Sequence, residues 1–88
     1  MKMVNIGFGN MLSVPRILTL LRADSQPVKR MVQEAKTART LIDCTQGRRT
    51  RAVLVLDSGH TVLSYLQPET IVHRLQNDNT QEETDEDE

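Results

Sequence analysis

The chain contains no apolar side chain after Leu75, which limits any hydrophobic core to the first 75 of its 88 residues. Residues 76–88 are Gln, Asn, Asp, Thr and Glu alone, so burial cannot offset the entropy lost on ordering them. We therefore expect a disordered acidic tail over residues 76–88. The rest is enough for a single domain over residues 1–75, because a second core would need roughly 50 more residues.

The sign of the net charge changes at the same point, after Leu75. All eleven Lys and Arg residues precede the tail together with five acidic residues, giving a body of formal charge +6, whereas the tail holds seven acids and no base. A basic body of this kind indicates an anionic partner such as nucleic acid. One hypothesis is that the tail competes with phosphates for the basic face. A tail that only increases solubility is the alternative.

Composition narrows the class of protein further. With one Phe, one Tyr and no Trp, the core must be aliphatic, which argues against base stacking on an aromatic platform. A domain this small buries only about 60% of its unfolded surface, so we expect self-association. The single Cys44 cannot form an internal disulfide. With no signal-like segment and no apolar run of roughly 18 residues, we expect a cytoplasmic protein without a membrane partner.

The hydropathy pattern predicts an α+β fold with a small, mostly antiparallel sheet. A main helix is expected over about 26–39, because Ser25 can cap it and Pro27 suits its first turn. Its apolar positions form one stripe at helical spacing: Val28, Met31, Val32, Ala35 and Ala38. A short helix over about 68–75 begins at Pro68 and Glu69.

Strands are expected on both sides of the main helix. Residues 52–56 are apolar at every position, which is typical of a central strand covered on both faces. Residues 61–66 return from a turn, so an antiparallel hairpin is expected over 52–66. Short strands are expected over 3–6, 11–14 and 41–44. Residues 16–21 fit either a strand or a helical turn.

The densest charge cluster, Arg48, Arg49 and Arg51, stands at the entry to the predicted central strand. In extended backbone Arg49 and Arg51 share a face and Arg48 points away. Guanidinium groups match phosphate oxygens, so this cluster is suited to a DNA backbone, with a solvated strand end as the alternative. Further cations could extend one basic surface or serve solvation only: Arg16, Arg22, Lys29, Arg30, Lys36 and Arg39.

Other motifs do not assemble a site for catalysis. The segment 7–9, Gly-Phe-Gly, lacks the Gly-Lys-Ser/Thr of a phosphate loop, and tight-turn glycines explain it better. His60 and His73 have no partner at metal-ligand spacing. Cys44 is expected to pack as a small hydrophobe. We therefore expect no enzyme, no metal, no cofactor and no small-molecule substrate.

Four segments together resemble the RemA family, the bacterial extracellular matrix regulatory protein A. They are NIGFGN at 5–10, PVKR at 27–30, GRRTRAV at 47–53 and QPET at 67–70, and the resemblance covers about residues 3–75. It implies a nucleoid-associated transcriptional regulator of duplex DNA, connected with biofilm matrix genes. It also implies a homo-oligomer closed into a ring.

The resemblance implies that Arg16, Arg48 and Arg49 carry DNA binding, and Arg51 joins them from the same cluster. A ring would repeat this patch and give multivalent, salt-dependent contact with the duplex. Candidate ring-interface residues, with the core of the subunit as the alternative, are the apolar side chains near the N-terminus: Val4, Ile6, Phe8, Met11 and Leu12. The alternative is a structural or protein-interaction ring whose basic face binds an acidic partner.

Overall fold

A computed structural model of the chain describes residues 2–76 and confirms the α+β fold. Its elements, in chain order, are β1 (Met3–Asn5), β2 (Met11–Ser13), β3 (Ile17–Arg22), α1 (Gln26–Ala38), β4 (Leu41–Asp43), β5 (Ala52–Leu56), β6 (Thr61–Ser64) and α2 (Pro68–Gln76). Of the acidic tail predicted over residues 76–88, Gln76 is the last residue of α2, and the other residues, with their hypothetical competition for the basic face, lie outside the described residues. Neither helix of residues 2–76 is long and apolar enough to cross a membrane.

A four-stranded sheet forms the centre of the fold, with strand order β3-β5-β6-β4. The predicted hairpin is confirmed, because β5 and β6 pair antiparallel around the turn at residues 57–60. Pairing is antiparallel between β3 and β5 and parallel between β4 and β6, while β1 and β2 form a separate antiparallel hairpin. The ambiguity at 16–21 resolves in favour of strand β3, which follows a 3-10 turn over Val14–Arg16.

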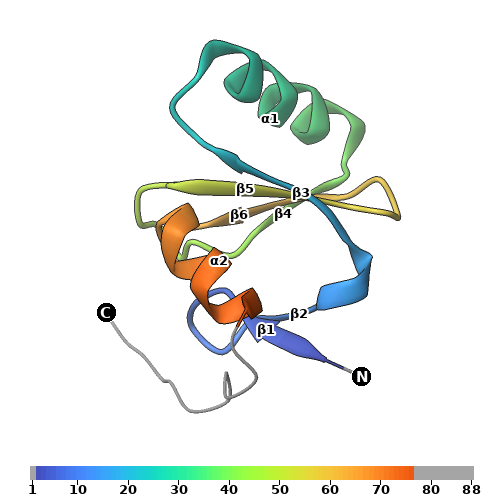
Figure 1. The fold of residues 1–88 in the computed structure, drawn as a ribbon. Helices are drawn as coiled ribbons and strands as arrows, with labels where there is room; N and C mark the ends of the chain where they lie inside the picture. Colours follow the sequence, from blue (N-terminus) through green and yellow to red (C-terminus); the bar gives the residue numbers. More distant parts are fainter. Residues whose placement is uncertain (1, 77–88) are drawn as a thin grey trace.

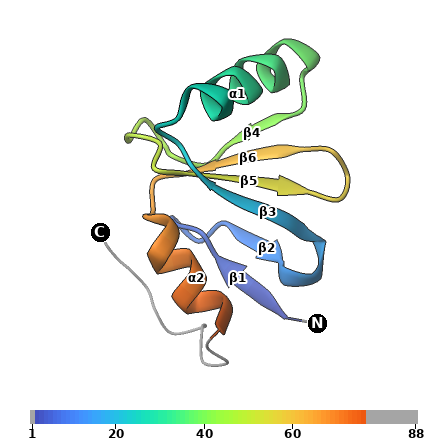
Figure 2. The same cartoon turned by 45° about the horizontal axis from the view of Figure 1, so that its top comes forward.

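The four-stranded sheet lies between two layers, with α1 on one face and α2 with the β1–β2 hairpin on the other (Figure 1; Figure 2). Alternate side chains of β5 pack into the apolar cores on the two faces of the sheet, as expected from the period of two in a strand. Val53 packs with Val28 beneath α1, while Leu54 packs with Ile6 and Ile71 on the opposite side. The prediction that residues 52–56 are covered on both faces is thereby confirmed.

Helix α1 begins and ends close to its predicted limits. The Ser25 hydroxyl accepts a hydrogen bond from the Val28 amide at 3.4 Å, and Pro27 lies in the first turn. The helix ends at Ala38 because Arg39 is left-handed, with φ of 62°, and its N–H donates to the Ala35 and Lys36 carbonyls. The predicted stripe is buried or half-buried except at Ala38, the last helical residue, which is exposed.

The hairpin and α2 are fixed to each other and to the sheet. Lys2 Nζ donates to the Leu75 carbonyl and Arg74 Nη1 to the Asn5 carbonyl, both at 2.9 Å. Ser64 Oγ, fully buried at the end of β6, donates to the Ile6 carbonyl at 2.7 Å. These contacts hold the turn after β1 against the end of β6.

This packing corrects the candidate ring interface. Val4 and Ile6 are 0% exposed, and both belong to the core of the subunit. The reason is register: Val4 pairs with Leu12 across the hairpin, and this face of the hairpin packs inward against the sheet and α2, leaving Leu12 half-buried. Phe8 and Met11 remain 42% and 43% exposed.

Candidate functional site

The loop between β4 and β5 carries the arginine cluster and is built on a defined turn. Asp43 accepts two hydrogen bonds from buried Thr45, at 2.9 Å from its N–H and 2.7 Å from Oγ1. The Arg48 N–H donates to the Thr45 carbonyl at 3.0 Å and closes the turn. Gln46 and Gly47 both have positive φ, 52° and 84°, a combination that glycine favours at the second position. The arginines therefore start from a fixed backbone.

Hydrogen bonding from Thr45 also changes the pKa of a carboxylate in the turn. The side-chain and backbone bonds from Thr45 lower the pKa of Asp43, so this carboxylate stays ionised further into the acid range than an ordinary aspartate. Burial raises the pKa of the neighbouring Cys44 thiol, and the Asp43 charge adds to the effect. A half-buried thiol of raised pKa is a poor nucleophile, in agreement with the packing role expected for Cys44.

Arg48 lies over a pair of aromatic rings. Its guanidinium carbon is 5.7 Å from the centre of the Phe8 ring and 5.6 Å from that of Tyr65, and the two rings are 4.7 Å apart. Such distances are within cation–π range. Gly7 permits the arrangement, because a Cβ at this position would lie 2.5 Å from Tyr65 Cε1. The turn after β1 thus positions Arg48.

Arg49 and Arg51 point to a different place. Together they line a surface hollow of about 260 Å³, with Arg22 from the end of β3 and Lys29 from α1. Asp24 and Gln67 also line it. The structure therefore places Arg49 and Arg51 at one hollow, which Thr50 between them also lines, and places Arg48 against the aromatic pair.

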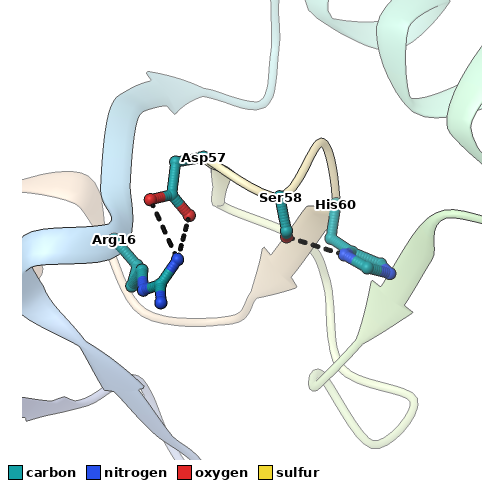
Figure 3. Close-up of polar contacts among 4 residues, drawn as sticks. All are labelled: Arg16, Asp57, Ser58 and His60. Carbon is teal, nitrogen blue, oxygen red and sulfur yellow. Dashed lines mark hydrogen bonds and ion pairs between the residues drawn. The ribbon is translucent and has the colours of Figure 1, made fainter.

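Arg16 lies at the opposite end of the sheet from these side chains. In the β3–β5 pairing Ile17 is opposite Leu56, whereas Arg22 is opposite Ala52. Arg16 Nη1 forms an exposed ion pair with Asp57 in the β5–β6 turn, 3.3 and 3.2 Å from its two carboxylate oxygens (Figure 3). Five strand residues, roughly 17 Å, separate this end from the arginine loop. One subunit does not bring Arg16 together with Arg48, Arg49 and Arg51.

The same turn holds one of the two histidines. Ser58 Oγ and His60 Nδ1 lie 2.8 Å apart beside the Arg16–Asp57 pair (Figure 3). His73 is on α2, on the far side of the sheet from α1. Over residues 2–76 no group of three or more His, Cys, Asp and Glu side chains could hold a metal ion.

Sequence reasoning missed the most specific part of the site. It named Arg22 and Lys29 only as members of a general basic surface. It gave no role to Tyr65 and considered Phe8 only as a candidate ring-interface residue. Their contact with Arg48 joins three distant segments, and no pattern within one segment could reveal it.

Comparison with known proteins agrees with the motifs. A family model described as RemA-like, extracellular matrix regulatory protein A-like, matches residues 3–75. The chain belongs to the RemA-like family. This match confirms the resemblance inferred from the four short segments, and it includes both the aromatic turn and the arginine loop.

RemA-like relatives are similar along most of the chain, and each is named for an inferred regulatory role. One from Dictyoglomus thermophilum is 57% identical over 84 residues, covering 96% of this chain and 99% of its own. One from Geobacillus kaustophilus is 53% identical over 75 residues, 85% and 86% of the two chains. One from Carboxydothermus hydrogenoformans is 51% identical over 82 residues, 93% and 94% of the two chains.

Proposed function

We propose that this RemA-like chain is a DNA-binding transcriptional regulator and not an enzyme. It acts as a closed ring of identical subunits and holds duplex DNA through repeated arginine patches. Because the family description refers to the extracellular matrix, the genes proposed as targets include those for biofilm matrix. The proposed location is the nucleoid in the cytoplasm.

One observation carries the proposal: five cationic side chains lie at one end of the sheet. Arg48 lies on the aromatic pair, while Arg22, Lys29, Arg49 and Arg51 surround the adjacent hollow. Guanidinium groups bind phosphate oxygens in pairs, and such contacts supply most of a sequence-tolerant affinity for duplex DNA. This end of the molecule fits a polyanion.

The shortage of aromatic rings supports phosphate contact over base stacking. The chain holds one Phe and one Tyr, and both rings lie against Arg48. Phosphate contacts give orientation and salt dependence with little sequence information. Regulation would then depend on DNA shape and on the number of phosphates that the protein binds.

A ring increases the number of phosphates that the protein can bind. A single subunit offers a few phosphate contacts, whereas linked copies raise the overall affinity by orders of magnitude. Arg16 enters the proposal at this level, because in a ring both ends of the subunit recur at regular intervals. A duplex lying along the ring can meet Arg16 of one subunit and the arginine loop of another.

The test compares two double variants of equal charge change. In Arg48→Ala/Arg49→Ala the arginine loop loses two cations. In Arg30→Ala/Lys36→Ala two cations are removed from the exposed side of α1, away from the hollow. Each variant is sized by light scattering and titrated into a fluorescein-labelled duplex.

We expect both variants to keep the wild-type mass. Only the arginine-loop variant should lose duplex affinity, by at least about tenfold, because it lacks two groups that form charge-assisted hydrogen bonds. Equal losses in the two variants would show that net charge alone binds DNA. If the wild type binds no duplex at low salt, the proposal is wrong, and an acidic protein partner for the basic face becomes the better account.

A further inference from the structure

The hollow beside the arginine loop differs from an ordinary basic surface because its four cations converge from three segments. Arg22 comes from the end of β3, Lys29 from α1, and Arg49 and Arg51 from the residues before β5. Among the described residues, Asp24 is the one acidic side chain that lines it. The lining therefore carries a clear excess of positive charge.

We propose that this hollow is a binding site for a single phosphate group. A planar carboxylate is satisfied by one guanidinium fork, whereas a tetrahedral phosphate presents oxygens in several directions and takes cations from several sides. The proposal deepens the proposed function where the phosphate belongs to the DNA backbone. A free phosphorylated molecule presents the same group, so the site has two sources of one ligand chemistry.

The size of the hollow agrees with a group of this kind. Pockets that enclose a whole small molecule usually have volumes of about 300 to 1,000 Å³. The hollow, at about 260 Å³, lies just below that range and is open to solvent. It can admit one phosphate group with water, while the rest of the ligand stays outside.

The backbone around the hollow is held in place before any ligand arrives. The Arg51 N–H donates to the Ser64 carbonyl at 2.9 Å, and the Arg51 carbonyl accepts from Ala23 at 3.3 Å. Arg51 is thereby tied to the strands on either side of β5. Lys29 is tied through its backbone, since its N–H donates to the Ser25 carbonyl at 3.0 Å. A backbone that is already fixed lowers the part of the ordering cost of binding that comes from the loop and the helix.

The ion pairs of the described residues engage few of the cations that line the hollow. Arg22 Nη2 is 2.8 Å from Glu69 Oε2 at the start of α2, which orients the guanidinium but uses only part of its five N–H donors. Within residues 2–76 no carboxylate forms an ion pair with Lys29, Arg49 or Arg51. Among the described residues, these three cations of the hollow are thus not engaged in ion pairs that a ligand would have to break.

The experiment titrates the full-length chain, labelled with ¹⁵N, with inorganic phosphate and follows the amide signals of Ala23, Thr50 and Gln67, which line the hollow. Sodium chloride of equal ionic strength is the reference. Lys29→Gln removes one cation of the hollow, and Lys36→Gln removes one from an exposed position of α1 outside it. Duplex affinity is measured for the same three proteins.

We expect saturable shifts of these three amides with phosphate and not with chloride. Lys29→Gln should weaken phosphate binding about tenfold, which corresponds to one charge-assisted hydrogen bond, and Lys36→Gln should not. If duplex affinity falls in Lys29→Gln alone, the DNA backbone supplies the phosphate. If duplex affinity is equal in all three proteins, a free phosphorylated molecule is the ligand.

The proposal is overturned if phosphate and chloride act alike on the wild type and Lys29→Gln binds the duplex as Lys36→Gln does. The duplex measurement on the wild type keeps this failure separate from that of the proposed function. If the wild type binds DNA but the hollow shows no preference for phosphate, the regulator proposal stands and the phosphate site is wrong. If the wild type binds phosphate but no duplex, the phosphate site stands and the regulator proposal is wrong.

Discussion

The guanidinium carbon of Arg48 lies 5.6 Å from the centre of the Tyr65 ring, although Arg48 precedes β5 and Tyr65 follows β6. Phe8 completes the contact from the turn after β1. Arg48 is therefore positioned by two segments other than its own loop. A cation held in this way loses less side-chain entropy when it meets a phosphate.

Removing the Phe8 ring should weaken DNA binding through Arg48. A cation–π contact at an exposed site contributes about 0.5–1 kcal/mol, so Phe8→Ala should lower duplex affinity by about two- to fivefold. The measurement is fluorescence anisotropy on Phe8→Ala, Arg48→Ala and the double variant. Light scattering shows whether each keeps its mass.

The double variant decides between positioning and direct contact. If Phe8 acts through Arg48, Phe8→Ala has no further effect once Arg48 is alanine. Additive losses would contradict the positioning role and indicate that Phe8 touches DNA or a neighbouring subunit by itself.

Gly7→Ala should destabilise the fold more than Gly9→Ala. Both positions have positive φ, 118° and 77°, so both variants carry backbone strain. At Gly7 the new Cβ would also meet Tyr65 Cε1 at 2.5 Å, whereas at Gly9 nothing lies within 4 Å. We expect urea unfolding to show losses of about 1 kcal/mol for Gly9→Ala and about 2–3 kcal/mol for Gly7→Ala. Equal losses would mean that Tyr65 does not need to lie against this turn.

The Asp43–Thr45 turn predicts a pH-dependent contribution to stability. Because hydrogen bonds from Thr45 lower the Asp43 pKa in the folded protein, the ionised carboxylate stabilises the fold. That contribution is complete above the unfolded pKa of about 4 and disappears as pH falls through the lower folded value. Asp43 is exposed, so the effect is small.

Urea unfolding of wild type and Asp43→Asn at pH 6 and pH 3 isolates this contribution, because other carboxylates cancel in the difference. Wild type should be the more stable at pH 6, with a smaller difference at pH 3. A difference that is the same at both pH values would contradict the role given to the Asp43 charge.

Local structure was predictable wherever it depends on neighbouring residues. Ser25 and Pro27 indicate the start of α1, and the uninterrupted apolar run at 52–56 indicates a strand buried on both faces. Both predictions are confirmed, because capping and the period of two act within one segment.

The candidate site was less predictable because it depends on pairing between segments. The register of β3 with β5 places Arg16 beside Asp57, away from the arginine loop. Packing of the β1–β2 hairpin, and not the hydrophobicity of its residues, places Val4 in the core and leaves Met11 exposed. Neither result can be predicted from a single segment of the sequence.

Met11 offers a test of the proposed ring. Met3 and Met11 lie on the side of the hairpin opposite Val4 and are 37% and 43% exposed. A charge buried at a subunit interface without a partner is strongly unfavourable. Met11→Glu should therefore reduce the mass measured by light scattering, and duplex affinity should fall because a separated subunit no longer binds the duplex in a multivalent way.

Gln33→Glu, which adds the same charge to the exposed side of α1, should leave the mass unchanged. A Met11→Glu protein of wild-type mass would exclude this part of the hairpin from the interface. Circular dichroism of both variants confirms that the subunit remains folded.

The central claim is that the cationic end of the sheet binds the phosphates of duplex DNA, and the salt dependence of binding tests it most directly. Each neutralised phosphate contributes about −0.9 to the slope of log affinity against log salt. We expect a steep linear decrease for the wild type and a shallower one for Arg48→Ala/Arg49→Ala, by about one unit for each phosphate that the variant no longer neutralises. Identical slopes for the two proteins, or affinity that does not depend on salt, would contradict the account.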